Sequence, residues 1–292
     1  MLFRRTLLLC GAAGACICVL WIQAQADQLP LEPPHDSGQS VTGAFEGWFK
    51  NPDGSFSILL GYYNRNLKQP VDIPVGPNNR IEPGGPDRGQ PTHFLPNRQW
   101  GMFTIIVPKD FGDQKLTWTI NVNGMPTVIP MSLNSLWEVS PFVDATGNTP
   151  PFIGFSEKGP FSQGPRPITE SLHTAAGAPL ALTVWVADDA KQPPIAPRFK
   201  LPPVLVTWSK FRGPGEVTFS KDRSPAEPSE FAAPPTTVFH GKATTTATFS
   251  QPGEYILSVV ANDSSGPGGG GFQCCWTNAQ VNVSVAPQTT AP

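Results

Sequence analysis

The sequence has few of the residues that define metal sites, disulfide-rich scaffolds or nucleic-acid-binding surfaces. Its 292 residues include only five cysteines and four histidines, and the histidines lie far apart in the chain. No H-E-x-x-H or C-x-x-C pattern occurs, so the sequence predicts no metal site and no cofactor. Charged residues make up only 14%, and 22 acidic residues outnumber 20 basic ones. This balance argues against a nucleic-acid partner.

Helical periodicity and catalytic motifs are also lacking. Beyond the N-terminus, no segment keeps a 3.6-residue apolar period long enough for a helix, which argues against enzymes built on helices packed over a parallel sheet. No Ser/His/Asp or Cys/His pattern stands out. The glycine-rich run at 266–271 has no lysine and opens no helix, unlike a phosphate-binding loop. A glycan-active enzyme is therefore the weakest of the functional hypotheses.

An apolar leader opens the chain. Two arginines precede an apolar core over residues 7–22, and Ala-Gln-Ala at 24–26 then fits the small-x-small rule for signal cleavage. We expect a signal peptide over 1–26 and an exported protein that is periplasmic, on the cell surface or secreted. The alternative is an uncleaved anchor, but the apolar core is shorter than the ~20 residues that span a bilayer. The mature chain is expected to contain no membrane span.

The export route stays open between three signals. Arg4-Arg5 resembles a twin-arginine signal, and residues 13–16 resemble a lipoprotein cleavage box. General secretion is the third route. The lipoprotein alternative is weaker, because cleavage there would leave an apolar start on the mature chain.

Alternating apolar and polar residues predict antiparallel β-structure throughout the rest of the chain. The clearest stretch is 242–261, where two alternating arms flank a Pro-Gly corner. A hairpin is expected over 42–64, because Asn-Pro-Asp-Gly at 51–54 has turn chemistry. Further strands are expected at 101–107, 115–123, 127–130, 180–187, 204–210, 216–220 and 280–285.

The 35 prolines and 28 glycines are dispersed between these segments, which is typical of many short strands. The predicted fold is all-β, with two antiparallel β-sandwich domains in tandem after a cleaved signal peptide. A flexible arm at 27–40 precedes an N-terminal sandwich at 41–164, which carries a long Pro/Gly-rich loop at 74–99. An immunoglobulin-like sandwich at 165–286 and a disordered tail at 287–292 complete the chain.

The second sandwich carries a recognisable set of motifs: VTWSK at 206–210, GPGEVTF at 213–219, ATF at 247–249 and PGEY at 252–255. Together they resemble the immunoglobulin-like modules of the polycystic-kidney-disease type found in exported bacterial proteins. The resemblance implies that Trp208 is the buried tryptophan of the third strand. It also implies that the Tyr255 hydroxyl turns back to a main-chain group, as in a tyrosine corner.

The loop at 74–99 is the candidate binding site, because long loops without periodicity are often functional. Its prolines limit the conformations that binding must order, and its arginines can fork onto carboxylate or sugar hydroxyl groups. The alternative is that these arginines pair with acids and serve structure alone. The candidate binding residues are Arg80, Glu82, Asp87, Arg88, His93, Arg98 and Trp100, with Trp48 and Tyr63 as further stacking candidates.

Two functional hypotheses follow. The first is an exported, non-catalytic binding or adhesion module for carbohydrate or another cell-envelope component, including an envelope protein. The second is a structural or spacer protein of the envelope without a specific ligand. They differ in whether Trp48, Tyr63 and Trp100 are exposed for stacking or buried in the core.

The adjacent Cys274 and Cys275 are the cysteines left after leader removal. In an oxidising compartment they form a vicinal disulfide, bridge to another chain, or point to opposite faces of a strand.

Overall fold

The computed structural model describes residues 35–191, 202–263, 265 and 274–288. The predicted signal peptide, most of the predicted arm, the glycine run and the last four residues lie outside this range. The described end of the arm, residues 35–40, is hydrogen-bonded to the segment after β2. For example, the N–H of Leu67 donates to the carbonyl of His35, and that of Arg65 donates to the carbonyl of Ser40. No helix among the described residues is long and apolar enough to cross a membrane.

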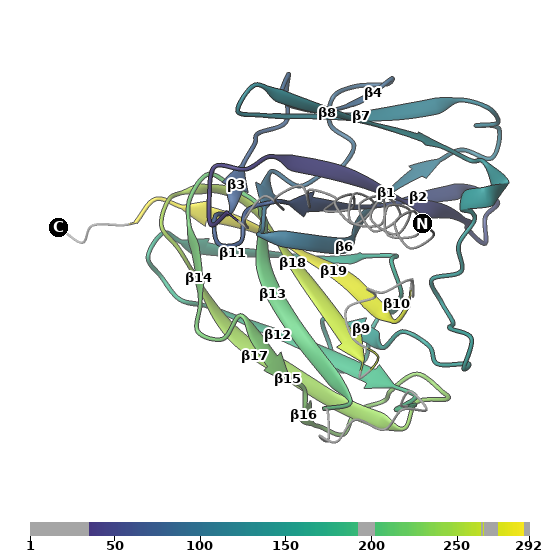
Figure 1. The fold of residues 1–292 in the computed structure, drawn as a ribbon. Coiled ribbons are helices and arrows are strands. Elements are labelled where there is room, and N and C mark those ends of the chain that lie inside the picture. The colour runs from purple at the N-terminus through teal and green to yellow at the C-terminus, as the bar shows by residue number, and fades with distance from the viewer. Residues whose placement is uncertain (1–34, 192–201, 264, 266–273, 289–292) are drawn as a thin grey trace, which may run out of the picture. The chain divides into compact units, whose positions relative to one another are not determined.

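The first half of the structure contains two three-stranded antiparallel sheets (Figure 1). One sheet has the order β1-β2-β6, and the other has the order β4-β7-β8; the short strands β3 and β5 pair separately. Their bounds are β1 Val41–Lys50, β2 Phe56–Asn64, β3 Val71–Asp72, β4 Asn79–Glu82, β5 His93–Phe94, β6 Asn97–Val107, β7 Lys115–Val122 and β8 Met125–Ser132, and the 3-10 helix η1 spans Ser135–Trp137.

Alternation of side chains explains the core of this half. In β7, Leu116, Trp118, Ile120 and Val122 are buried, while the residues between them face outward. Trp118 meets Phe103 of β6 edge to face at 5.3 Å between ring centroids, which joins the two sheets. The predicted hairpin is confirmed: β1 and β2 pair around the Asn51–Ser55 turn, whose bonds the Asn51 and Asp53 side chains complete.

The second half is a sandwich of a five-stranded and a six-stranded sheet. The strands β11, β19, β18, β13 and β15 form one sheet, with β11 parallel to β19 and the other pairs antiparallel. The other sheet runs β10-β9-β12-β17-β14, with β16 paired to β17. Their bounds are β9 Phe152–Gly154, β10 Phe161–Gln163, β11 Ile168–Ala175, β12 Leu180–Asp188, β13 Val204–Arg212, β14 Val217–Phe219, β15 Arg223–Pro225, β16 Glu227–Pro228, β17 Phe239–Phe249, β18 Gly253–Asp263 and β19 Trp276–Ala286.

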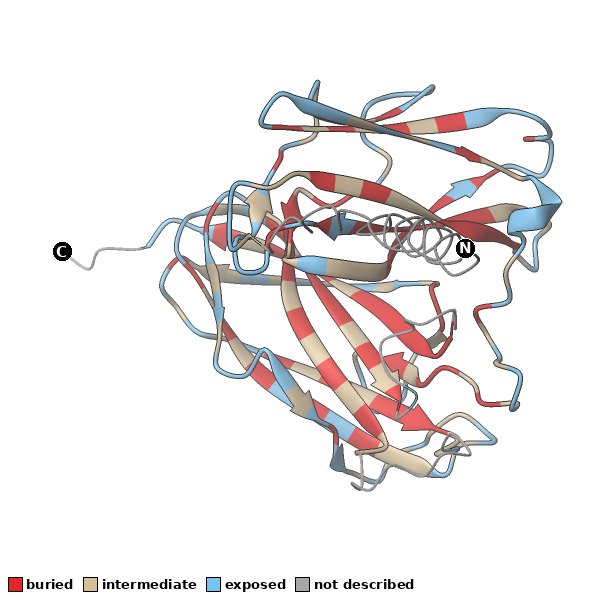
Figure 2. Ribbon diagram, in the orientation of Figure 1, coloured by how far each residue is buried: buried red, intermediate tan, exposed pale blue. Residues whose placement is uncertain are grey.

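Facing residues of the two sheets form a continuous apolar core, visible as the regular red bands along β13 and β18 in Figure 2. Trp208 is buried in this core, as the resemblance implied. The Tyr255 hydroxyl donates to the carbonyl of Gln251 at 2.8 Å and accepts from the N–H of Gly215 at 3.0 Å. Tyr255 therefore forms a tyrosine corner, and the half is an immunoglobulin-like sandwich.

The predicted strands are confirmed, and the structure adds elements that the sequence did not indicate. The stretch at 74–99 is more ordered than predicted, because β4, β5 and the start of β6 lie within it. The hairpin of β9 and β10 lies before Gly164, yet it extends the sheet of the second half through β12. The strands β4, β5, β9 and β10 have two to four residues each, so they are too short to show a period of two.

Candidate functional site

The charged residues of the 74–99 stretch were the first candidates for a binding site, and the structure uses several of them locally. Arg80 and Glu82 form an exposed ion pair at 2.8 Å, and Arg80 also donates to the carbonyl of Pro77. The Arg88 guanidinium donates to the carbonyl of Pro83 at 2.6 Å. The Arg88 bond lies within the turn between β4 and β5, whereas both contacts of Arg80 stay within β4 and the residues just before it.

Asp87 contacts the second half of the chain directly, and His93 contacts Asp72, which in turn meets Lys210 of the second half. Arg212 of β13 makes a bidentate ion pair with Asp87, with N–O distances of 2.9 and 2.8 Å. His93 lies 2.8 Å from Asp72, and Lys210 of β13 approaches the same carboxylate at 3.3 Å. Burial acts to raise the pKa of Asp72, but its contacts with His93 and Lys210 outweigh burial and lower it; the pKa of Asp87 is lowered chiefly by its hydrogen bonds from Arg212. Asp87 and Asp72 therefore help to join the two halves, and His93 contacts Asp72.

Trp48 is buried in the core of the first half. Its indole N–H donates to the carbonyl of Asn134 at 2.8 Å, and its ring meets Phe56 edge to face. Its ring is not offered to solvent.

Arg98 and Trp100 lie together on a partly exposed surface with Tyr63. Tyr63 of β2 and Arg98 of β6 are directly opposite in the ladder, so their side chains leave the sheet on the same side. The Arg98 guanidinium stacks on the Trp100 ring at 3.8 Å from its centroid, and Arg65 lies 5.4 Å from the Tyr63 ring. Tyr63 is 39% exposed. We call Tyr63, Arg65, Arg98 and Trp100 the Trp100 face.

A largely buried ion pair between Arg98 and Glu46 fixes the position of this face. Irregularities in the pairing of β1 with β2 and of β2 with β6 bring Glu46 next to Gly61, where a Cβ would overlap the Glu46 carboxylate. Arg98 donates to Glu46 at 2.5 Å, and the N–H of Gly101 donates to it at 2.7 Å. Burial raises the pKa of Glu46, partly offset by Arg98 and by the Gly101 N–H. The Arg98 guanidinium is therefore held by two contacts: its ion pair with Glu46 and its stacking on the Trp100 ring.

The Trp100 face adjoins the second half of the chain. Gly101, with φ of 53°, has no room for a Cβ because the Trp276 ring of β19 lies against it. The Asn278 amide donates to the carbonyl of Gly101. The glycine after Trp100 is thus required for close approach of β19.

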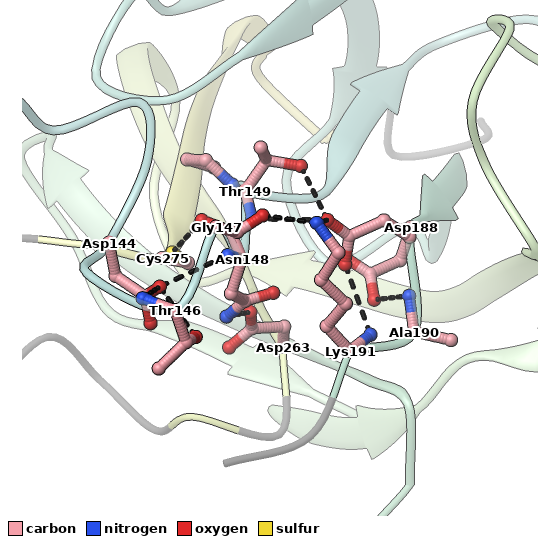
Figure 3. Close-up of polar contacts among 12 residues, drawn as sticks. Asp144, Thr146, Gly147, Asn148, Thr149, Asp188, Ala190, Lys191, Asp263 and Cys275 are labelled. Carbon is pink, nitrogen blue, oxygen red and sulfur yellow. Dashed lines mark hydrogen bonds and ion pairs between the residues drawn. The ribbon is translucent and has the colours of Figure 1, made fainter. Parts of the chain in front are cut away.

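A second polar group, not singled out from the sequence, lies where β12 and β18 end (Figure 3). We call Asn148, Asp188, Asp189 and Asp263 the Asp188 cluster. Asn148 donates to Asp263 at 2.6 Å, and the Thr149 hydroxyl donates to Asp189 at 3.0 Å. Burial raises the pKa of Asp188 to about 7, and repulsion from Asp263 and Asp189 acts in the same direction. Burial also raises the pKa of Asp263.

Cys274 and Cys275, at the start of β19, form a vicinal disulfide beside this cluster. Both are buried, and their sulfurs lie 3.8 and 3.5 Å from the carbonyl oxygen of Asn148. A disulfide sulfur carries no proton, so these are contacts and not hydrogen bonds. The disulfide packs on the segment that carries Asn148.

We expect Asp188→Asn to change the pH dependence of stability. The folded pKa of Asp188 is raised above its unfolded value, so stability is greatest when the carboxyl is protonated and falls as pH rises toward 7. The Asn variant does not lose this stability. The free energy of unfolding of the variant, minus that of the wild type, should therefore increase by about 2 to 4 kcal/mol from pH 4.5 to pH 8.

Urea unfolding of the chelator-treated protein at both pH values measures this difference. The exposed Asp110→Asn variant should show less than ~0.5 kcal/mol of change. An Asp188→Asn effect that does not vary with pH would show that Asp188 is ionised normally.

Comparison with known proteins gives no family. No protein-family profile and no curated protein matches the chain. Among solved structures, it is similar to the D00-D0 domain of intimin at 14% identity, covering 84% of this chain and 99% of that one, with a TM-score of 0.25. The Yersinia pseudotuberculosis adhesin InvE is 11% identical, with coverages of 84% and 58% and a TM-score of 0.23. Domains 4 and 5 of the S-layer protein SbsC are also 11% identical, with coverages of 85% and 98% and a TM-score of 0.22. TM-scores this low carry no argument about function.

Proposed function

We propose that the protein is an exported, non-catalytic binding module that recognises carbohydrate of the cell envelope through the Trp100 face. The observation that carries the proposal is the grouping of Tyr63 and Trp100 with two arginines on one partly exposed surface. Aromatic rings supply flat apolar surfaces for sugar rings, and arginine supplies several donors for hydroxyl groups.

The rigidity of the face supports binding. Arg98 is fixed by Glu46 and by the carbonyls of Tyr62 and Gln99, at 3.0 and 2.6 Å. A side chain that is already ordered loses less entropy when a ligand binds. The exposed ring of Tyr63 is held by its strand and by Arg65.

The second candidate is a structural or spacer role without a specific ligand. It is favoured by the ion pairs that Asp87 and Asp72 make with Arg212 and Lys210 of β13, since these contacts join the halves and occupy Asp87, a candidate binding residue. For this reason the binding site proposed here differs from the one predicted from the sequence. Of the nine candidate residues, Tyr63, Arg98 and Trp100 are retained in the site, and Arg65 is added to it.

A glycan array with the chain from residue 27 onward tests the proposal. We expect binding to at least one envelope glycan, with a loss of at least about tenfold in affinity for Trp100→Ala and for Tyr63→Ala. Trp137→Ala is the matched control, because Trp137 is 53% exposed and lies on η1, outside the Trp100 face.

Two results would reject the proposal. Absence of binding to every glycan would favour the spacer role. Loss of binding in Trp137→Ala, with Trp100→Ala unchanged, would place the site around η1. Circular dichroism of each variant separates loss of binding from loss of folding.

A further inference from the structure

Among the described residues, the Asp188 cluster brings three acidic side chains together beside one lysine. Its three carboxylates come from Asp188, Asp189 and Asp263, and Lys191 approaches one of them, with Nζ 3.5 Å from Asp189. Asp188 and Asp263 are only 1% and 5% exposed. Water therefore contributes little to stabilising their charges, which is a costly arrangement for ionised groups.

Within the part of the chain that the structure describes, two oxygens in the cluster have no hydrogen-bond donor. Asp188 accepts from the N–H of Ala190 with one oxygen, while its Oδ1 has no partner. Asn148 is 3% exposed, and its Oδ1 also lacks a partner. The Nδ2 of the same amide donates to Asp263, so the free Oδ1 lies beside that carboxylate (Figure 3). Buried acceptors in folded proteins nearly always have a donor or a cation.

We propose that Asn148, Asp188 and Asp263 bind a divalent cation, for which calcium is the best suited. The two free oxygens and the Asp263 carboxylate are hard oxygen donors, the type that calcium and magnesium prefer. Calcium accepts an irregular shell of six to eight oxygens that includes carbonyls and water, whereas magnesium requires a near-ideal octahedron.

The donor set also indicates which metals are disfavoured. No group of three or more His, Cys, Asp or Glu side chains in the described part of the chain is arranged to hold a metal ion. The proposed site has two carboxylates and one amide, and it lacks the imidazole and thiolate ligands that zinc sites commonly use. The calcium shell would instead be completed by main-chain carbonyls and water around two carboxylates and one amide.

The three ligands come from three separate segments. Asn148 belongs to the connection before β9, Asp188 ends β12, and Asp263 ends β18. A bound cation would tie this connection to both sheets of the second sandwich. The site is independent of the Trp100 face and of the proposed carbohydrate binding.

Calcium titration of the full chain by calorimetry, after treatment with a chelator, tests the inference. At pH 8 we expect one bound calcium per chain and a melting temperature about 5 °C higher in 1 mM CaCl2 than in EDTA. Asp188→Asn and Asp263→Asn should abolish both effects, and Asp110→Asn should retain them. Both test variants keep the size of the side chain and remove a buried charge, so they are expected to fold.

Competition with protons gives a second readout. Between pH 8 and pH 5.5 the calcium affinity should fall by at least about tenfold, because protonated carboxyls are poor ligands. Absence of binding heat and of a melting shift in the wild type at pH 8 would overturn the inference. So would equal calcium binding in both Asn variants, since the ion would then bind elsewhere.

Discussion

Replacing Trp208 with alanine should lower the free energy of unfolding by about 3 to 5 kcal/mol. The ring is buried between the two sheets of the second half, where Val206 and Leu257 also contribute to the same core. Removing it leaves a cavity that the surrounding strands cannot fill. The ring already borders a cavity of about 260 Å³, and its indole N–H has no partner, so no hydrogen bond is lost. Chemical unfolding monitored by circular dichroism measures the cost.

Trp137→Ala is the control for this experiment, because it removes the same side chain from an exposed position. It should cost less than ~1 kcal/mol. A Trp208→Ala cost below ~1 kcal/mol would show that Trp208 is not part of the core.

Arg98→Ala should also lower the free energy of unfolding by about 3 to 5 kcal/mol, because it removes contacts in the first half of the structure. The change removes the guanidinium from the buried carboxylate of Glu46, whose side chain is 4% exposed. A buried charge without its counter-charge is far more costly than the lost ion pair alone. The folded pKa of Glu46 is already raised, and losing Arg98 raises it further, so the cost should grow as pH rises above the unfolded pKa.

The matched control is Arg80→Ala, since Arg80 pairs with Glu82 on the surface and should cost no more than ~1 kcal/mol. The double variant Glu46→Gln/Arg98→Ala should recover part of the stability, because it removes the charge that Arg98→Ala leaves behind. If the double variant is less stable than Arg98→Ala, the loss comes from packing on Trp100 and not from the charge.

Much of the architecture could be predicted from the sequence, because period-two alternation is a local signal. The arms at 242–261 largely bury every second side chain, whereas the hairpin at 42–64 is buried on both faces along much of its length; both stretches are strands in the structure. The tyrosine corner was accessible through the PGEY motif. By contrast, β11 mixes Glu170 and His173 into its alternation, so its apolar period is weak.

The site could be predicted only in part, because it depends on pairs of residues that are distant in the sequence. Glu46 and Arg98 lie 52 residues apart, and Asn148 and Asp263 lie 115 apart. No local pattern signals such pairs. Asp188 and Asp263 are each the last residue of a strand, where an acidic residue normally indicates a turn. Arg98 and Trp100 were identified because they flank a proline-rich stretch, whereas the contact of Asp87 with Arg212 required the three-dimensional structure.

The most direct test of carbohydrate recognition at the Trp100 face is oxidative footprinting with the best glycan from the array. The wild-type chain would be oxidised by hydroxyl radicals with and without this glycan, and the modified residues would be identified by mass spectrometry. We predict that the glycan protects Tyr63 and Trp100 and leaves the exposed Trp137 unchanged. Protection of Trp137 alone, or of no residue on the Trp100 face, would contradict the proposed function.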